Sequence, residues 1–342
     1  MNGIILRTCD PQVLLSHLAL YGLAAILEAK GIPDARIEWT AGGNPRPQLT
    51  ARSADDVAIG HLIAEHARSA AAEGSWLRRD ITLKGTPRGL MSPRLTPFED
   101  DDTWGQAQQD RHEILDDLTD TGRWLDLRLL AALGEPCYWS FNRQGALLQD
   151  DGASRLEMQP RNQGSEFVGT RLRSLAAAVA ARDTAQILAG LRGDTVVDEV
   201  GHDKPDSRTA TGLAGPGPAD NALAWCALWG ISQFPIAMRI NATAATSGHL
   251  GRSRNEWFYA PVWNGQWQPA RLRTILASTR LCTVSAADLN LRTGAVTDAE
   301  ASAARRWLSA REVAGLVRFP IRRFGSDSAP ERRAMRGELI SV

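Results

Sequence analysis

The sequence predicts an α+β fold, in which an N-terminal mixed α/β domain is followed by a helical and β-containing C-terminal region. Near the N-terminus, short strand patterns alternate with helix patterns. In the middle of the chain, apolar residues recur at helical spacing in several segments. After Pro235, aromatic and β-branched residues gather into strand-like runs. A chain of 342 residues is long enough for two such regions with a full core.

The N-terminal α+β domain is predicted to span residues 1–84. Gly3–Arg7 is an apolar run typical of a short strand. A helix is expected to begin at Asp10-Pro11, with aspartate as the N-cap and proline in the first turn, and to end at Gly31. The remaining elements are strands at 37–40 and 47–51 and a helix that Ser53 would cap, ending near Ala72.

Residues 85–200 form the predicted acidic and helical middle region. It starts with a loop or extended arm at 85–98, which holds three prolines and two glycines. Residues 99–126 then hold ten Asp and Glu against two Arg, a net charge of −8. The elements expected after this stretch are helices at 124–133, from Phe167 to Val179 and from Asp183 to Gly193, and a strand at 138–141.

Residues 201–220 show no periodicity and are predicted to be a linker at a soft domain boundary. The basic, arginine- and aromatic-rich C-terminal region follows at 221–342. Asp220 would cap its first helix, in which Trp225 and Trp229 are expected in the core. The further elements expected are strands within 236–242 and 256–262 and helices at 269–277 and 298–308.

Bulk properties predict a cytoplasmic protein with no membrane segment. No apolar run reaches 18 residues, and residues 1–7 lack the pattern of a signal peptide. The four cysteines are scattered among apolar neighbours and are expected to be reduced core residues rather than a zinc site or a disulfide framework: Cys9, Cys137, Cys226 and Cys282.

The charge of the chain is polarised. Residues 1–238 hold 23 Lys and Arg against 31 Asp and Glu, whereas residues 239–342 hold 16 against 8. The net charges of −8 and +8 cancel in the total. Only three of the 39 basic residues are lysines. Arginine forks bind phosphates bidentately and aromatic faces stack on bases, so the C-terminal region favours a nucleic-acid partner.

The sequence lacks the common catalytic and cofactor-binding motifs. There is no Walker loop, no dinucleotide-binding glycine motif, no zinc-protease motif, no nucleophile elbow and no nuclease lysine–carboxylate pattern. His61 and His66 are expected on the surface, and the doublet His202-Asp203 alone does not make a metal site. The sequence therefore predicts a protein that is not an enzyme and has no cofactor. One alternative stays open, a divergent metal-dependent nuclease using the carboxylates at 99–102.

Two clusters are candidate nucleic-acid contacts. The loop 161–164 offers side chains that can read base edges, unless it is only a polar turn. A second cluster lies around residues 252–273, and its alternative is a hairpin with core aromatics and surface arginines. The full set of candidate contacts is Arg161, Asn162, Gln163, Arg171, Arg173, Arg252, Arg254, Asn255, Trp257, Arg271, Arg273, Arg322 and Arg323.

Four stretches together resemble the large subunit of type I-G CRISPR effector complexes, formerly called type I-U. They are DPQVLLSHLALYGLAAILEAKG, ARIEWT, WCALWGISQFPIA and EWFYAPVWNGQWQPARLRTIL. The resemblance implies a non-catalytic subunit of a crRNA-guided surveillance complex. Such a subunit contacts the motif beside the DNA target, helps open the duplex, supports the displaced strand and receives a helicase-nuclease.

The implied partners are crRNA, target DNA, the CRISPR backbone and crRNA-processing subunits, and the helicase-nuclease. On this reading the 161–164 loop would read the adjacent motif, and the C-terminal region would hold the DNA strand. The acidic stretch 99–126 would suit a protein partner, because it repels phosphates. A standalone DNA-binding regulator is the other alternative, although the sequence shows no clear helix-turn-helix.

Overall fold

The computed structural model describes most of the chain and has the predicted α+β fold. The described residues are 2–95, 98, 100–146, 148–158, 167–240, 242–252, 255–289, 297–326 and 329–342.

The N-terminal sheet has three antiparallel strands, β1 (Asn2–Ile5), β2 (Arg36–Trp39) and β3 (Pro47–Ala51), in the order β1-β3-β2. Each strand lies within about two residues of its predicted position. Leu49 pairs with Ile4 on one side and with Ile37 on the other, and all three are buried. This apolar row faces the two N-terminal helices, α1 (Leu14–Ala29) and α2 (Asp56–Ala71).

The starts of both helices differ from the prediction. The carboxylate of Asp10 accepts a hydrogen bond from the backbone N–H of Gln12, which makes a local turn, and α1 begins only at Leu14. The hydroxyl of Ser53 donates to Asp34, so Asp55 caps α2 instead. In both cases a short polar side chain could form a hydrogen bond with either of two partners, and the sequence does not indicate which of the two it binds.

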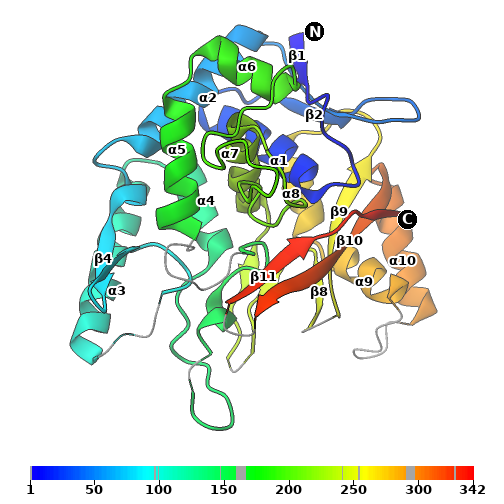
Figure 1. The fold of residues 1–342 in the computed structure, drawn as a ribbon. Coiled ribbons are helices and arrows are strands. Elements are labelled where there is room, and N and C mark those ends of the chain that lie inside the picture. Colours follow the sequence, from blue (N-terminus) through cyan, green and yellow to red (C-terminus); the bar gives the residue numbers. More distant parts are fainter. Residues whose placement is uncertain are drawn as a thin grey trace.

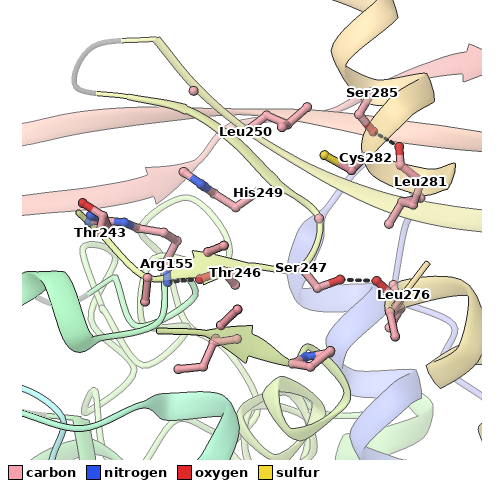
Figure 2. A pocket seen from close by; sticks show the side chains of 18 of the residues that line it. Arg155, Thr243, Thr246, Ser247, His249, Leu250, Leu276, Leu281, Cys282 and Ser285 are labelled. Atoms are coloured by element: carbon pink, nitrogen blue, oxygen red, sulfur yellow. Dashed lines mark hydrogen bonds between the residues drawn. The ribbon is translucent and has the colours of Figure 1, made fainter. Parts of the chain in front are cut away.

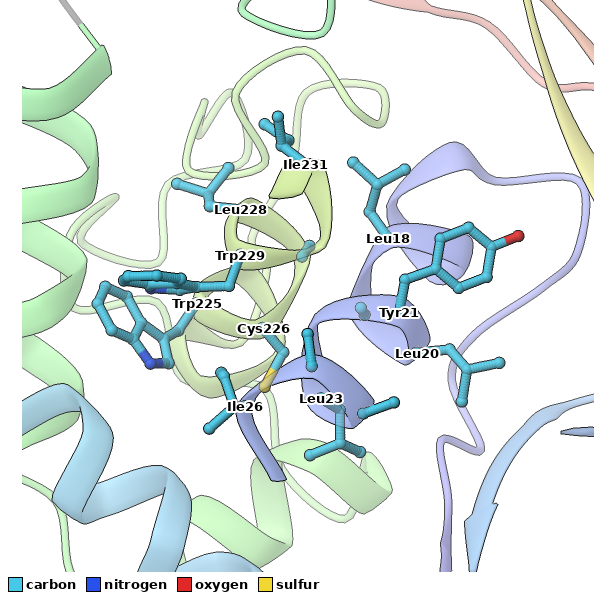
Figure 3. Packing of buried hydrophobic residues seen from close by; sticks show 14 of the residues in the cluster. Leu18, Leu20, Tyr21, Leu23, Ile26, Trp225, Cys226, Leu228, Trp229 and Ile231 are labelled. Atoms are coloured by element: carbon cyan, nitrogen blue, oxygen red, sulfur yellow. The ribbon is translucent and has the colours of Figure 1, made fainter. Parts of the chain in front are cut away.

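Helix α7 (Asn221–Gly230) packs against α1 (Figure 3), and both lie in the centre of the molecule (Figure 1). Asp220 caps α7 as predicted, through a hydrogen bond from Ala222. Trp225 and Trp229 are buried as predicted and contact the ring of His66 from α2. The surface position predicted for His66 is therefore wrong. His61, on another face of α2, is exposed.

The middle region contains more regular structure than predicted. Strand β5 (Thr86–Gly89) forms inside the segment 85–98 expected to be a loop, and it pairs as a hairpin with β4 (Asp80–Leu83) at the end of the N-terminal region. No strand forms at 138–141. The helices are α3 (Asp101–Asp120), α4 (Trp124–Leu133), α5 (Arg173–Ala180), α6 (Thr184–Arg192), one π-helical segment η3 (Phe167–Leu172), and the 3-10 turns η1 (Trp76–Arg78) and η2 (Gln149–Gly152). The capping box of Asp183 with Gln186 is present as predicted.

The C-terminal sheet is antiparallel and larger than predicted. Its strands are β8 (His249–Arg252), β9 (Asn255–Trp263), β10 (Val313–Ser326), β11 (Ala329–Ala334) and β12 (Glu338–Ser341), in the order β11-β10-β9-β8 with β12 also paired to β10. Beside it lie the hairpin β6 (Ile236–Ala237) with β7 (Ala245–Thr246), the turn η4 (Ile231–Gln233), and helices α8 (Pro269–Leu276), α9 (Thr279–Asp288) and α10 (Asp298–Ser309). Strand β10 and helix α9 were not predicted.

Residues 201–220 contain no helix or strand, but the segment is built into the core. The carbonyl of Leu213 accepts a hydrogen bond from Leu15 of α1, and that of Gly212 accepts one from Ala334 of β11. One cluster of buried apolar side chains includes Leu213 and extends from β1 to β11. In Figure 1, α1 and α7 lie between α5 and α6 on one side and the C-terminal sheet on the other.

Cys9, Cys137 and Cys226 are buried as predicted, whereas Cys282 on α9 is exposed. Among the described residues, no helix combines the length and the apolar character needed to cross a membrane.

Candidate nucleic-acid interface

The end of the C-terminal sheet carries arginines on both faces. Beyond the pair Ile321–Glu256, β10 continues without β9 and is paired with β11. Arg322 lies opposite Arg333, and Arg323 lies opposite Arg332. Because side chains alternate between the faces of a strand, these four arginines divide into two pairs, one on each face.

The outer face combines charge with an aromatic ring. Arg322 and Phe324 are exposed, and the guanidinium of Arg333 lies 4.7 Å from the centre of the Phe324 ring. Arg333 also donates to the carboxylate of Glu331, whereas Arg322 forms no ion pair with any residue of the described chain. Arg322 can therefore reach an external anion without breaking an internal ion pair.

On the other face of this strand end, Glu256 of β9 lies opposite Ile321 and lines a cleft of about 1160 Å³. Three structures line it: the hairpin β6–β7, the hairpin β8–β9, and the ends of α8 and α9. Figure 2 shows Arg155 and His249 on one side and Leu276 and Leu281 near the opposite side. Arg239 and Asn255 also line the cleft, and both are exposed.

Charge in and behind the cleft is mostly positive. Its one lining carboxylate, that of Glu256, lies 3.2 Å from Nε2 of His249. Burial lowers the pKa of His249, although Glu256 opposes the shift, so the imidazole is neutral near pH 7. Arg332 lies on the same sheet face as Glu256. Burial, together with Arg94 and Arg155, lowers its pKa to about 9, which leaves it protonated.

Several predicted contacts cannot be placed. Arg161, Asn162, Gln163 and Arg254 lie outside the described residues, and Arg252 belongs to β8 without a described side chain. Asn255 is exposed at the start of β9, and Trp257 is half-buried two residues later. Arg322 and Arg323 are exposed on β10.

Three of the predicted arginines are engaged inside the fold. The guanidinium of Arg173 donates to both carboxylate oxygens of Asp80 and to the carbonyl of Leu77. Arg271 pairs with Glu312 and lies over the ring of Trp267. Arg273 pairs with Glu28. Arg171 is half-buried within η3. These side chains join elements that are far apart in sequence, and no local pattern reveals that use.

The aromatic residues of β9 and its following loop are core residues, as the alternative interpretation of that cluster proposed. Phe258, Tyr259, Trp263 and Trp267 are all buried, and the rings of Trp263 and Trp267 stack at 4.5 Å. They cannot stack on bases in this fold. Base stacking was predicted from the number of aromatic residues in this segment. Composition does not show which face of a strand a side chain lies on.

The acidic stretch forms a different surface. Asp100 caps α3, and the helix exposes six carboxylates that form no ion pair with any described residue: Asp101, Asp102, Glu113, Asp116, Asp117 and Asp120. Its one arginine, Arg111, is buried and donates to the carbonyl of Leu90. Aromatic rings flank both ends of the helix, with Tyr138 48% and Trp124 61% exposed.

At the start of α3, four aromatic rings including that of Tyr138 contact one another in a row. The centres of Phe98 and Trp104 are 4.8 Å apart, those of Trp104 and Tyr138 4.2 Å, and those of Tyr138 and Trp139 5.0 Å. Exposed aromatic rings beside an uncompensated charge are typical of a protein-binding surface.

Within the described residues, no group of three or more histidine, cysteine or acidic side chains is arranged to hold a metal ion. Asp101 and Asp102 occupy the first turn of α3, and Glu99 lies outside the described residues. His202 and Asp203 form a turn with positive φ angles, in which Asp203 accepts a hydrogen bond from the backbone of Asp198.

Comparison with protein-family models finds no match for this chain, and comparison with curated proteins finds none either. A function is therefore inferred from the residues of the chain itself.

Proposed function

We propose that this chain is a non-catalytic large subunit of a crRNA-guided DNA surveillance complex, in which the C-terminal strand end contacts DNA. The observation that carries the proposal is the exposed pair Arg322 and Phe324 on β10, beside which lies Arg333 of β11, itself paired with Glu331. Guanidinium groups bind phosphate oxygens, and an exposed aromatic ring offers a stacking surface for an unpaired base.

The charge distribution separates this face from the rest of the molecule. Residues 239–342 have a net charge of +8, whereas α3 presents six unpaired carboxylates that repel phosphates. A nucleic acid is therefore attracted to one end of the molecule and excluded from the other. In the proposed complex, crRNA and target DNA would lie on the basic side.

A salt series tests the DNA contact. Affinity for a labelled single strand and for a duplex is measured by fluorescence anisotropy at increasing salt concentration. The double variant Arg322→Ala/Arg323→Ala should weaken binding and flatten the dependence of log affinity on log salt by about 0.9 per lost duplex contact and about 0.7 per lost single-strand contact.

The matched control is Arg68→Ala/Arg78→Ala, which removes two exposed arginines of the N-terminal region. The control should leave both affinity and slope unchanged. If the control pair flattens the slope and the β10 pair does not, DNA runs over the N-terminal region and the proposed interface is wrong.

We further propose that α3 and its flanking aromatic rings dock a basic protein surface of the same complex, which in the implied assembly belongs to the backbone subunits or the helicase-nuclease. The exposed carboxylates supply charge complementarity, and Tyr138 and Trp124 supply apolar anchors. Such a contact would leave the basic end free for DNA.

Charge neutralisation tests this docking. The variant Glu113→Gln/Asp116→Asn/Asp117→Asn should lose co-sedimentation with the partner subunits while keeping its DNA affinity. Glu73→Gln/Asp206→Asn removes exposed carboxylates elsewhere and is the control. Partner binding that survives the α3 variant but is lost in the control would place the docking surface outside α3.

A further inference from the structure

We infer that the cleft between the hairpins β6–β7 and β8–β9 and helix α9 binds a single unpaired nucleotide, with its base on the apolar wall and its phosphate toward Arg155 and Arg239. This inference rests on the proposed DNA contact and adds a specific subsite for a base to it.

The size of the cleft fits this ligand. Sites for ligands of drug size measure roughly 300–1,000 Å³. The cleft, at about 1160 Å³, therefore accommodates one nucleotide together with water. Both hairpins and the adjoining ends of α8 and α9 contribute to its lining (Figure 2).

The lining is divided by chemistry. Ile236 and Leu250 are half-buried on the cleft wall, and Leu276 and Leu281 lie beneath the surface near the wall formed by α8 and α9. Three hydroxyls in the cleft donate to partners inside the protein: that of Thr243 to Asp151, that of Ser247 to the carbonyl of Leu276, and that of Ser285 to the carbonyl of Leu281. The apolar wall therefore offers a base a face to pack on, rather than hydrogen-bonding groups that would select its identity.

The other side of the cleft favours an anion. Arg155 and Arg239 line it, and Arg323 and Arg332 lie on the same sheet face behind it. The single lining carboxylate, on Glu256, is hydrogen-bonded to the neutral imidazole of His249, and the positive charges of Arg332 and Arg155 lie close enough to act on it. A ligand with one flat apolar part and one anionic part matches this division, and a nucleotide has both.

The pattern favours an unpaired nucleotide over a duplex. In a duplex the base faces are stacked on one another, so only an unpaired base can lay its face on the apolar wall. His249 and Glu256 at the cleft lie on the sheet face opposite Arg322 and Phe324, whereas Leu250 lies on the same face as Arg322. A strand held by the outer face could thus direct one base into the cleft.

Cys282 provides a reporter for occupancy, because it lines the cleft and is the exposed cysteine of the chain, the other three being buried. Alkylation of Cys282 by a maleimide is followed by mass spectrometry, with and without a single strand of about ten nucleotides, a typical site length. With the free strand at about ten times its Kd, occupancy should slow alkylation about tenfold.

Three comparison ligands sharpen the test. The first is a set of strands of the same sequence, each with a single abasic site at a different central position. The second is a duplex of equal length, and the third is a poly-glutamate peptide. Each should protect Cys282 at least about threefold less than the intact single strand does at matched occupancy. Equal protection by the duplex or by the peptide would overturn the inference, because neither presents an unpaired base to the wall. Binding of the single strand without any protection of Cys282 would also overturn it, while leaving the proposed DNA contact intact.

Two variants separate the cleft from the outer face. Leu250→Glu places a carboxylate on the apolar wall and should abolish both the protection and the preference for the intact strand over the abasic one. Arg239→Glu changes an exposed side chain, serves if Leu250→Glu does not fold, and should have the same effect. Arg322→Ala should lower affinity yet leave full protection at saturation. If the cleft variants retain protection, the cleft does not hold the base.

Discussion

Arg273 in α8 forms a bidentate ion pair with Glu28 at the end of α1, with nitrogen–oxygen distances of 2.7 and 2.9 Å. Arg128 of α4 also contacts the same carboxylate, at 3.4 Å. Burial alone would raise the pKa of Glu28, but hydrogen bonds and charge from Arg273 and Arg128 lower it overall. One carboxylate thus joins three helices that are up to 245 residues apart.

Replacing Arg273 by alanine should destabilise the fold without changing DNA affinity. The pair is partly shielded from water, so its loss should lower the free energy of unfolding by about 1–2 kcal/mol. Urea unfolding followed by circular dichroism measures this change. Arg280→Ala, which removes an exposed arginine of α9, should cost under about 0.5 kcal/mol. If a stably folded Arg273→Ala protein lost DNA affinity, Arg273 would contact DNA, and the prediction would be wrong.

The contact between α1 and α7 should tolerate no side chain at Gly22. A Cβ atom there would lie 1.8 Å from the carbonyl oxygen of Cys226 and 2.5 Å from the backbone nitrogen of Gly230. Because the neighbouring atoms belong to a buried helix backbone, Gly22→Ala must push the helices apart and should cost about 3 kcal/mol or more.

Gly105 of α3 provides the matched control, since a Cβ there meets no atom within 4 Å. Gly105→Ala should stabilise the protein by about 0.5–1 kcal/mol, because alanine has the higher helix propensity. The same substitution should thus have opposite signs at the two sites, as measured by thermal or urea unfolding. Similar effects at both sites would mean that the helices are not in close contact.

Stability should fall as the pH falls below about 6.5, because His17 and His66 are fully enclosed in neutral form. Burial lowers the pKa of His17 from 6.5 to about 4, and burial with Lys30 and Arg123 lowers that of His66 to about 3. Below pH 6.5 the unfolded chain binds protons that the folded chain excludes. Each histidine should therefore remove about 1.4 kcal/mol per pH unit, down to its folded pKa.

His66→Leu should make the free energy of unfolding less dependent on pH, by about 1.4 kcal/mol per pH unit between about pH 5 and 6. His61→Leu, on the exposed side of the same helix, should leave the slope unchanged. Urea unfolding at a series of pH values measures both. If the two variants behave alike, His66 titrates normally and is not enclosed by Trp225 and Trp229.

The parts of the fold that were predictable are those determined by neighbours in sequence. The capping box of Asp183 with Gln186 and the cap by Asp220 involve residues within three positions of each other, and both are present. Strand β10 was missed because prolines, glycines and arginines interrupt its apolar pattern. Its pairing with β9 and β11, which lie on either side of it in the sheet, explains why it forms a strand of 14 residues.

The candidate site was less predictable than the fold. The charge polarity pointed to the C-terminal region, and Arg322 and Arg323 are exposed there. Other arginines form ion pairs with carboxylates that are distant in sequence, such as Glu28, Asp80 and Glu312, and these pairs decide whether an arginine is available to bind a nucleic acid. The cleft was not predicted at all, because elements from Arg155 to Ser285 come together only in the folded chain.

Residues 201–220 should resist proteolysis, because a buried carboxylate holds them. Asp198 accepts hydrogen bonds from the hydroxyls of Ser207 and Thr209 and from the amide of Asn221. Burial alone would raise the pKa of Asp198, but these hydrogen bonds lower it overall. Asp198→Ala leaves several buried donors without a partner and should cost about 3 kcal/mol or more.

Limited trypsin digestion at the bond after Arg208 measures whether this segment is anchored. Arg208 itself is exposed, but Thr209 is buried, so the native chain should be cut there slowly. Asp198→Ala should be cut much faster at that bond, under conditions where its circular dichroism still shows a folded protein. Asp206→Ala removes an exposed carboxylate of the same segment and should be cut at the native rate. Rapid cutting of the native chain after Arg208 would instead support a flexible linker, because only a segment that leaves the core can enter the protease.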